Sequence, residues 1–200
     1  MLATSPNASQ FIADALQNRF NRAILERLPS LDLPDAWLVA GCLFQSVWNL
    51  KSGRPPEADI KDYDLFYFDA GDLSEAAETG VGQRVEACFA DLGVTVEAKN
   101  QARVHTWYAA YFGFPYEPLT SSKSGIDRFL VPCTCVGLQN RAAESSAGEL
   151  DLMLYAPYGL DDLYQGILKP NPLCNHIPLF AEKARSYQSR WDWLNIQNMG

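Results

Sequence analysis

Ala36-Trp-Leu-Val-Ala-Gly41-Cys-Leu-Phe-Gln-Ser-Val-Trp48, followed by Asp62-Tyr-Asp64-Leu-Phe-Tyr-Phe-Asp69, is the stretch that decides the fold. Its pattern predicts a buried strand over 36–40, a turn at Gly41, a helix over 42–50 and a strand over 60–68. Side chains at i and i+2 of a strand share a face, about 6.5–7 Å apart. Asp62 and Asp64 are therefore placed to hold the same divalent cations, as phosphoryl transfer requires.

The length and composition indicate one domain. The chain has 200 residues, of which 48% are hydrophobic, and no apolar run reaches the roughly 18 residues of a membrane span. We expect a single domain over 1–200, with an N-terminal helix in 1–30, a catalytic core in 36–155 and C-terminal helices in 156–200. The N-terminus lacks the basic and apolar regions of a secretory signal, so the cytoplasm is the expected location.

Charge and cysteine spacing exclude two classes of protein. A net charge of −8 argues against extended nucleic-acid binding, which needs a basic face. It leaves room for a nucleotide, because a divalent cation and a few local Lys or Arg residues can neutralise one triphosphate. Five cysteines at irregular positions match neither a disulfide framework nor a zinc site.

The remaining periodicity predicts an α+β fold, a small mixed sheet with helices packed on it and helical segments at both ends. Val94–Lys99 alternates as a half-buried strand with Glu97 on its polar face. A capping box at Asp72-Leu-Ser-Glu75 opens a helix that reaches about Leu92. Further helices are predicted over 8–28, 105–111, 160–168 and 178–194, and further strands over 129–138 and 149–155.

Several motifs in order resemble a known family. Val39-Ala-Gly41 entering a helix and Asp62-Tyr-Asp64 between apolar residues resemble the DNA polymerase β-like nucleotidyltransferase superfamily. Together with Trp48, Lys99-Asn-Gln-Ala-Arg103-Val-His105 and Ala156-Pro-Tyr-Gly-Leu-Asp-Asp162-Leu, they resemble a bacterial nucleotidyltransferase-like family without a settled biochemical role. This resemblance runs from about residue 36 to the end. It implies a fold like the head domain of CCA-adding enzymes, with the active site on the strands that carry the carboxylates.

The resemblance implies a two-metal site with Mg²⁺ or Mn²⁺ as cofactor. Asp62 and Asp64 would bind the metals, and a third carboxylate from a neighbouring strand would complete the set. Glu97 is the candidate, because it lies on a polar strand face just before the Lys99–His105 block, and Asp151 is the competitor.

Phosphate contacts are expected at the glycine turn. Gly41 and Cys42 would offer backbone N–H groups at a helix N-terminus, and Lys99 and Arg103 would offset the remaining negative charge. Two features depart from the superfamily: Cys42 stands where a second small residue is usual, and the interval from Gly41 to Asp62 is longer. Four of the five tryptophans, Trp48, Trp107, Trp191 and Trp193, are interpreted as packing residues.

Three functions follow as hypotheses. The first is a metal-dependent nucleotidyltransferase that moves a nucleoside monophosphate from an NTP to a hydroxyl of an unidentified acceptor, which the sequence does not name. The second is a nucleotide-binding or interaction module on the same fold with little turnover. The third is a metal-dependent phosphohydrolase, which the scarcity of histidine disfavours, because only His105 and His176 are present.

Overall fold

A five-stranded mixed sheet organises the chain. The computed structural model describes residues 7–142, 150–174 and 176–197. The strand order is β3-β2-β1-β4-β5, in which β2 and β3 run parallel and all other neighbours run antiparallel. The strands are β1 Trp37–Val39, β2 Asp62–Tyr67, β3 Thr95–Asn100, β4 Gly137–Asn140 and β5 Leu152–Tyr155. The predicted α+β class is confirmed, and β2 is a central strand with a neighbour on each side.

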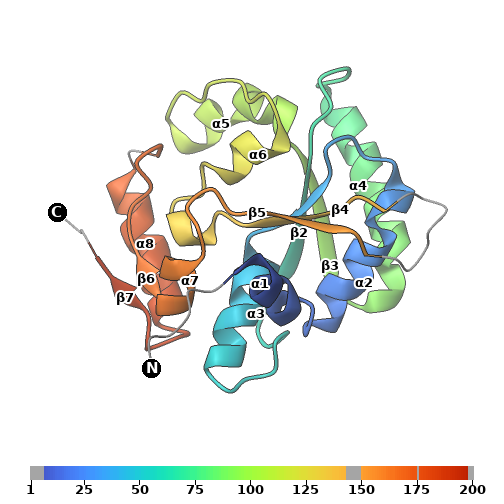
Figure 1. The fold of residues 1–200 in the computed structure, drawn as a ribbon. Coiled ribbons are helices and arrows are strands. Elements are labelled where there is room, and N and C mark those ends of the chain that lie inside the picture. The colour runs from blue at the N-terminus through green and yellow to red at the C-terminus, as the bar shows by residue number, and fades with distance from the viewer. Residues whose placement is uncertain (1–6, 143–149, 175, 198–200) are drawn as a thin grey trace.

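Helices cover both faces of this sheet (Figure 1). The helices α1 to α3 lie below the sheet in that view, α5 and α6 lie above it, and α8 stands at one side. Their bounds are α1 Ala8–Ala15, α2 Arg19–Arg27, α3 Gly41–Lys51, α4 Glu75–Phe89, α5 Val104–Phe112, α6 Ser122–Ile126, α7 Asp161–Gln165 and α8 Ile177–Gln188. Within the described residues, no helix is both long and apolar enough to cross a bilayer.

The N-terminal helix is broken, contrary to the prediction of one helix over 8–28. The chain leaves the first helix after Ala15 and begins the second at Arg19. Asn18 causes the break, because its side-chain oxygen accepts hydrogen bonds from the N–H groups of Phe20 and Asn21 and so caps the second helix. An apolar stripe at four-residue spacing does not reveal such an internal cap.

The cap of α4 also differs from the predicted box. Ser74 is the N-cap, and its hydroxyl accepts from the N–H of Ala77. The carboxylate of Asp72 accepts from the N–H of Ser74, so Asp72 lies two residues before the N-cap and does not cap the helix itself. The predicted end at about Leu92 lies close to the observed one. The α-helix ends at Phe89, a 3₁₀ turn over Ala90–Leu92 follows, and Gly93 then adopts a left-handed φ of +67°.

The later elements are shorter than the periodicity indicates. The predicted strand 129–138 is mostly loop and a 3₁₀ turn at Pro132–Thr134, and the strand itself starts at Gly137. The predicted helix 160–168 ends at Gln165, and Ile167–Leu168 forms β6, which pairs in parallel with β7 at Asn195–Ile196. The predicted strand 149–155 starts at Leu152, and Glu149 lies outside the described residues.

The two faces of the sheet are packed unequally. Tyr63, Leu65 and Tyr67 of β2 enter the large core with the helices α1 to α4. The opposite face carries a small cluster around Trp37, Val39, Ile126 and Cys135. Successive strand residues point to opposite faces, so Asp62 and Asp64 lie on the side of the small cluster. That side has too few large residues to fill it and leaves room for a cleft.

Asn100 fastens the end of β3 to the end of β2. Its side chain, 2% exposed, accepts from the N–H groups of Asp69 and Ala102 and donates to the carbonyl of Asp69. The two hydrogen bonds with Asp69 tie the segment that follows β2 to the end of β3, and the bond from Ala102 caps the 3₁₀ turn that follows β3, so Asn100 is a structural residue.

We expect Asn100→Ala to lower the free energy of unfolding by about 2–4 kcal/mol, because the backbone groups of Asp69 and Ala102 lose their hydrogen-bond partners. Urea unfolding at pH 7 measures the change. Asn195→Ala, on an exposed strand position, is the matched control and should change stability by less than about 0.5 kcal/mol. Equal effects of the two substitutions would show that the Asn100 hydrogen bonds do not stabilise the fold.

Candidate active site

The two acids of β2 stand beside the glycine turn. In the antiparallel pairing of β1 with β2, Val39 lies opposite Asp64. The chain then passes through Ala40 and enters α3 at Gly41, so the turn comes next to the acids. Asp62 is exposed, whereas Asp64 is partly buried. Both line a cleft of about 380 Å³ together with Gly41.

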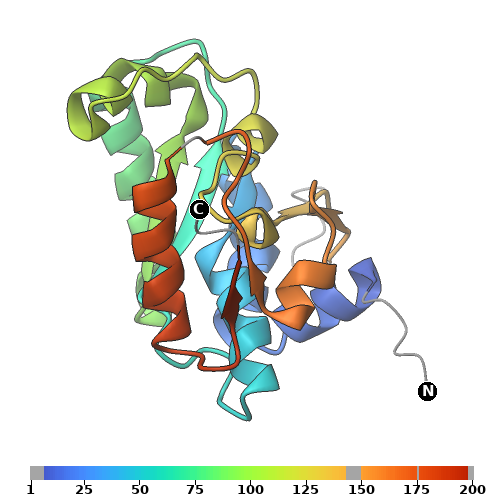
Figure 2. The same cartoon turned by 90° about the vertical axis from the view of Figure 1, so that its left-hand side faces the viewer.

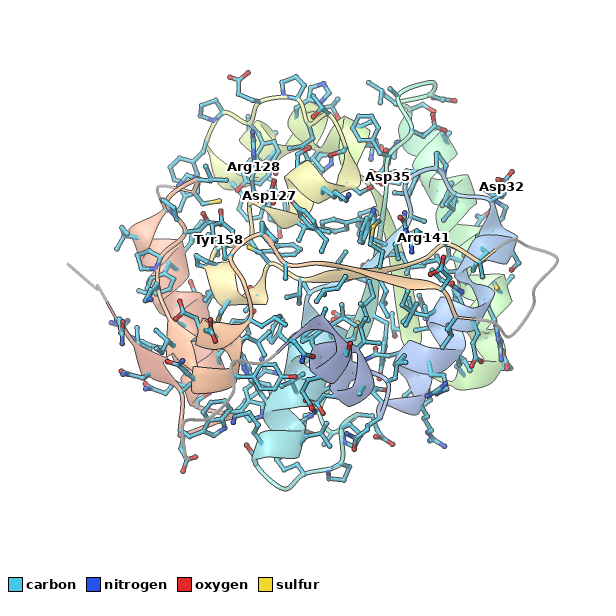
Figure 3. The ribbon with its side chains drawn as sticks, in the orientation of Figure 1. Asp32, Asp35, Asp127, Arg128, Arg141 and Tyr158 are labelled. Carbon is cyan, nitrogen blue, oxygen red and sulfur yellow. The ribbon has the colours of Figure 1, made fainter. Side chains whose placement is uncertain are left out.

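The third predicted acid lies on the neighbouring strand. In the parallel pairing of β2 with β3, Glu97 lies opposite Asp64 and therefore on the same face. Its carboxylate pairs with Lys99, with 3.2 Å between Oε2 and Nζ, and Glu97 lines the groove between α4 and β3 rather than the cleft of the aspartates. The competitor, Asp151, lies by the far edge of the sheet, where it pairs with Arg141 at 3.0 Å. In Figure 3, Arg141 lies to the right of the centre of the molecule, apart from Arg128 and Asp127 at the upper left.

The environment of Asp64 opposes its negative charge. Burial, then the charge of Asp62, then the charge of Glu97 together raise the pKa of Asp64 to about 6. Lys99 and Lys183 act in the opposite direction and do not cancel the rise. The negative charges of Asp62 and Glu97 thus reach Asp64, and this repulsion favours a cation beside the two aspartates.

A strained residue makes the turn into α3. Ala40 has φ +49° and ψ −110°, which an L-residue rarely adopts, and its carbonyl accepts from the N–H groups of Leu43 and Phe44. A Cβ at Gly41 would lie 3.1 Å from Nε2 of Gln45, which also lines the cleft. The glycine therefore keeps the floor of the cleft open at the start of the helix.

Cys42 does not face the cleft. Its side chain is fully buried in the large core, and its Sγ lies 3.6 Å from the carbonyl oxygen of Val39. Burial raises the pKa of the thiol well above its usual value. Only the backbone N–H of Cys42 remains as a contact for phosphate, and the thiol in place of a smaller residue does not obstruct the cleft.

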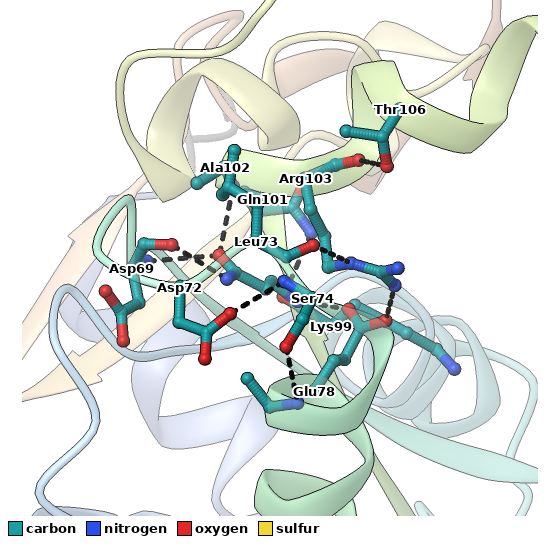
Figure 4. Close-up of polar contacts among 12 residues, drawn as sticks. Asp69, Asp72, Leu73, Ser74, Glu78, Lys99, Gln101, Ala102, Arg103 and Thr106 are labelled. Carbon is teal, nitrogen blue, oxygen red and sulfur yellow. Dashed lines mark hydrogen bonds and ion pairs between the residues drawn. The ribbon is translucent and has the colours of Figure 1, made fainter.

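The structure separates Lys99 and Arg103 from the cleft of the aspartates. Lys99 pairs with Glu97. Arg103 forms an ion pair with Glu78 of α4 and donates from Nε to the carbonyl of Leu73 (Figure 4). Neither side chain lines that cleft, so the structure does not bring these two predicted phosphate ligands to it.

Two cations that sequence reasoning missed line the cleft instead. Lys183 comes from α8, which Figure 2 shows as a long helix standing beside the sheet, and Arg128 comes from the segment after α6. The ammonium of Lys183 lies 5.4 Å from the ring centre of Tyr187. In the described parts of the chain, neither cation forms an ion pair with a carboxylate. Lys183 repeats with Leu179 and Tyr187 at four-residue spacing, and that helical spacing is the signal that could have found it.

Hydrogen bonds to α3 fix the position of α8. Arg190 donates from Nη1 to Oε1 of Gln45 at 3.0 Å, and the indole N–H of Trp191 donates to Oδ1 of Asn49 at 3.0 Å. Trp191 is buried against Trp48, with ring centres 5.2 Å apart. The wall of the cleft that carries Lys183 is thus held against the helix that begins at Gly41.

Asn171 holds the backbone around Arg128. Its amide donates to the carbonyls of Asp127 and Phe129, both at 2.7 Å, and its side-chain oxygen accepts from the hydroxyl of Tyr158. The same hydroxyl lies 3.2 Å from the carbonyl oxygen of Asp127, so its single proton is shared between these two acceptors. Figure 3 shows Tyr158 beside Asp127. This network fixes the backbone that presents Arg128.

The carboxylates of Asp62 and Asp64 suit a divalent cation, but the third carboxylate, that of Glu97, is paired with Lys99. Carboxylate oxygens are the ligands that Mg²⁺ prefers, and Asp62 and Asp64 supply them from one strand face. Over residues 7–142, 150–174 and 176–197, no three Asp, Glu, His or Cys side chains are gathered as a finished metal site. The ion pair with Lys99 turns the Glu97 carboxylate aside, so Glu97 would have to rotate to join the pair.

Comparisons with known proteins give one family match and one similar solved structure. Residues 26–196 match a protein family described as "Nucleotidyltransferase". A solved structure described as "The NMR structure of the protein reveals a CCA-adding enzyme head domain" is similar over 96% of both chains, with 27% sequence identity and a TM-score of 0.72. Among curated proteins, no match was found. The likeness to the solved structure confirms the predicted fold.

We expect Asp64→Asn to be more stable than the wild type at pH 8 by about 1–3 kcal/mol. The pKa of Asp64 is raised by folding, so the wild type loses stability as the pH rises from about 4 to about 6. The amide cannot ionise, and the difference should therefore vanish towards pH 4. Urea unfolding across this range, without divalent cations, measures it.

Asp151→Asn is the control, because it also neutralises an acid but only removes an exposed ion pair with Arg141. It should change stability by less than about 0.5 kcal/mol. A difference for Asp64→Asn that did not vary with pH would contradict the raised pKa.

Proposed function

Since the chain belongs to the nucleotidyltransferase family, we propose that it transfers a nucleoside monophosphate from an NTP to a hydroxyl of an unidentified acceptor, with Mg²⁺ or Mn²⁺ at Asp62 and Asp64. The observation that carries this proposal is the cleft in which both acids lie beside Gly41 and Lys183. Negative charge for a metal and positive groups for phosphate thus line one cleft. That combination suits a metal-bound triphosphate better than a metal ion alone or a phosphate group alone.

Lys183 and the start of α3 are assigned to the triphosphate. The first N–H groups of a helix have no acceptor within the helix and attract phosphate oxygens. Lys183 faces the same cleft from α8 and forms no ion pair within the described residues. The strained turn at Ala40 brings the helix start up to the acids.

The proposed reaction is a displacement at the α-phosphorus. The acceptor oxygen forms a bond to the α-phosphorus, the bond from that phosphorus to the bridging oxygen breaks, and pyrophosphate leaves. The proton of the acceptor hydroxyl passes to a carboxylate of the site or to water. When bound, the divalent cations would stabilise the charge on the attacking and leaving oxygens. Asp62 and Asp64 hold the cations, and Glu97 remains the candidate for the third carboxylate.

One observation favours a second function, a nucleotide-binding module with little turnover. Glu97 is engaged by Lys99 and lines a different groove from the two aspartates. If Glu97 does not join the aspartates, nucleotide binding would persist while activation of the acceptor hydroxyl would be weak. Incubation with α-labelled ATP and a panel of hydroxyl compounds separates the two functions, because only the transferase moves label to an acceptor.

MgATP should raise the melting temperature of the wild type, and Lys183→Ala should weaken MgATP binding about 3- to 10-fold through loss of one exposed cation. Arg185→Ala is the matched control, because Arg185 is an exposed cation on the same helix that does not line the cleft. Its affinity for MgATP should equal that of the wild type. Identical responses of the wild type and the Asp62→Ala/Asp64→Ala double variant would refute the proposed function.

Glu97→Gln should lower the affinity for Mn²⁺ by about 10-fold or more if Glu97 rotates to complete the metal site. Asp151→Asn, which removes the competing carboxylate at the far edge of the sheet, should leave Mn²⁺ affinity unchanged. Isothermal titration calorimetry with Mn²⁺ and a non-hydrolysable NTP measures both. The reverse ranking would move the third ligand to Asp151, and no effect of either would favour the binding module.

A further inference from the structure

An aromatic cavity adjoins the cleft of the two aspartates. It encloses about 650 Å³, within the range usual for small-molecule sites. Seven of its fifteen lining residues are aromatic, among them Trp107, Tyr108, Tyr111 and Phe112 of α5. Tyr108, Phe112, Arg128 and Phe129 line both the cavity and the cleft. A ligand in this cavity would therefore lie next to Asp62 and Asp64.

The aromatic rings of α5 pack against one another but remain partly exposed. Tyr111 is 78% exposed, Phe112 is 38% exposed and Trp107 is 37% exposed. Trp48 and Trp191 are buried as expected, and Trp107, although partly exposed, packs against the rings of Tyr108, Tyr111 and Phe112. Exposed rings gathered around a cavity mark a binding site for an apolar or planar ligand.

Arg128 supplies a charge at the junction of the cavity and the cleft. The other two cations of the cavity are engaged, Lys99 by Glu97 and Arg103 by Glu78. The guanidinium of Arg128 lies 4.8 Å from the ring centre of Tyr116 and forms no ion pair in the part of the chain that the structure describes. An anionic group on the ligand would complement it.

The position of the cavity suits the acceptor rather than the donor. The Gly41 turn, assigned to the phosphates, continues β1 on one side of β2. Lys99, which lines the cavity, belongs to β3 on the other side of β2. In an in-line displacement the attacking oxygen and the leaving oxygen lie on opposite sides of the phosphorus. The acids of β2 stand between these two sides.

We propose that the aromatic cavity is the acceptor site and takes a small planar aromatic molecule that carries a hydroxyl and an anionic group. The role of the cavity as acceptor site rests on the proposed function, but binding of a ligand in the cavity can be tested without a nucleotide. The ring lies among the aromatic side chains of α5, and the anionic group pairs with Arg128. The hydroxyl points towards Asp62 and Asp64.

The test compares two probes that share a hydroxyl and a carboxylate, 6-hydroxy-2-naphthoate and trans-4-hydroxycyclohexanecarboxylate. The indole N–H resonance of Trp107, assigned by its loss in Trp107→Phe, reports occupancy of the cavity. We expect the naphthoate to shift this resonance and the saturated analogue to leave it in place. Equal binding of the two probes would overturn the requirement for a planar ring.

Variants locate the site. Tyr111→Ala, at a highly exposed position, should weaken naphthoate binding about 2- to 10-fold, and Arg128→Gln should also weaken it. Phe114→Ala is the matched control, because Phe114 is 41% exposed and does not line the cavity. A loss for Phe114→Ala as large as that for Tyr111→Ala would place the probe outside the cavity and overturn the proposal.

Two further measurements separate the alternatives. MgATP and the naphthoate should bind together, whereas displacement of the probe by MgATP would assign the cavity to the base of the donor. If MgATP does not bind at all while the probe does, the acceptor role falls with the proposed function and the aromatic site alone stands. Analytical ultracentrifugation should show a monomer. If the wild type is instead a dimer and Tyr111→Ala is a monomer, the aromatic rings of α5 bind a second copy of the chain and the proposal is overturned.

Discussion

The position of β2 between β1 and β3 is the constraint on which the site depends. One register sets Val39 opposite Asp64 and so brings the Gly41 turn to the acids, and the other sets Glu97 opposite Asp64. A slip of one residue in either pairing would exchange the faces of the strand and drive Asp62 and Asp64 into the large core. Tyr63, Leu65 and Tyr67, buried on the opposite face, oppose such a slip, because it would take all three out of the core.

The same geometry opposes stability, because repulsion among neighbouring carboxylates and burial raise the pKa of Asp64. A protein without use for this charge would gain from an apolar residue at position 64. The large core on the other face offsets the cost. The smaller cluster around Trp37 and Val39 leaves space beside the acids, so one asymmetry of packing provides both the stability and the cleft.

Local pattern predicted the parts of the site that lie close together in sequence. The alternation of Val94–Lys99 placed Glu97 on the face that carries Asp64, and the apolar flanks of Asp62 and Asp64 marked a central strand. Lys183 and Arg128 were not predicted, because only the long-range packing of α8 and of the segment after α6 places them at the cleft. Lys99 and Arg103 were assigned to phosphate, but the nearest acids, Glu97 and Glu78, take both, and a sequence does not show that competition.

The attachment of α8 to α3 bears on how the protein matures. The hydrogen bond from Trp191 to Asn49 joins residues that are 142 positions apart, and the bond from Arg190 to Gln45 spans 145 positions. Closing loops of this length is slow compared with forming local helices. During synthesis, the acids and the glycine turn emerge long before the helix that supplies Lys183. The cleft therefore gains its last wall only after α8 and the residues up to Trp191 have left the ribosome, and a nascent chain that stops before α8 holds the acidic strand without the cation that faces it.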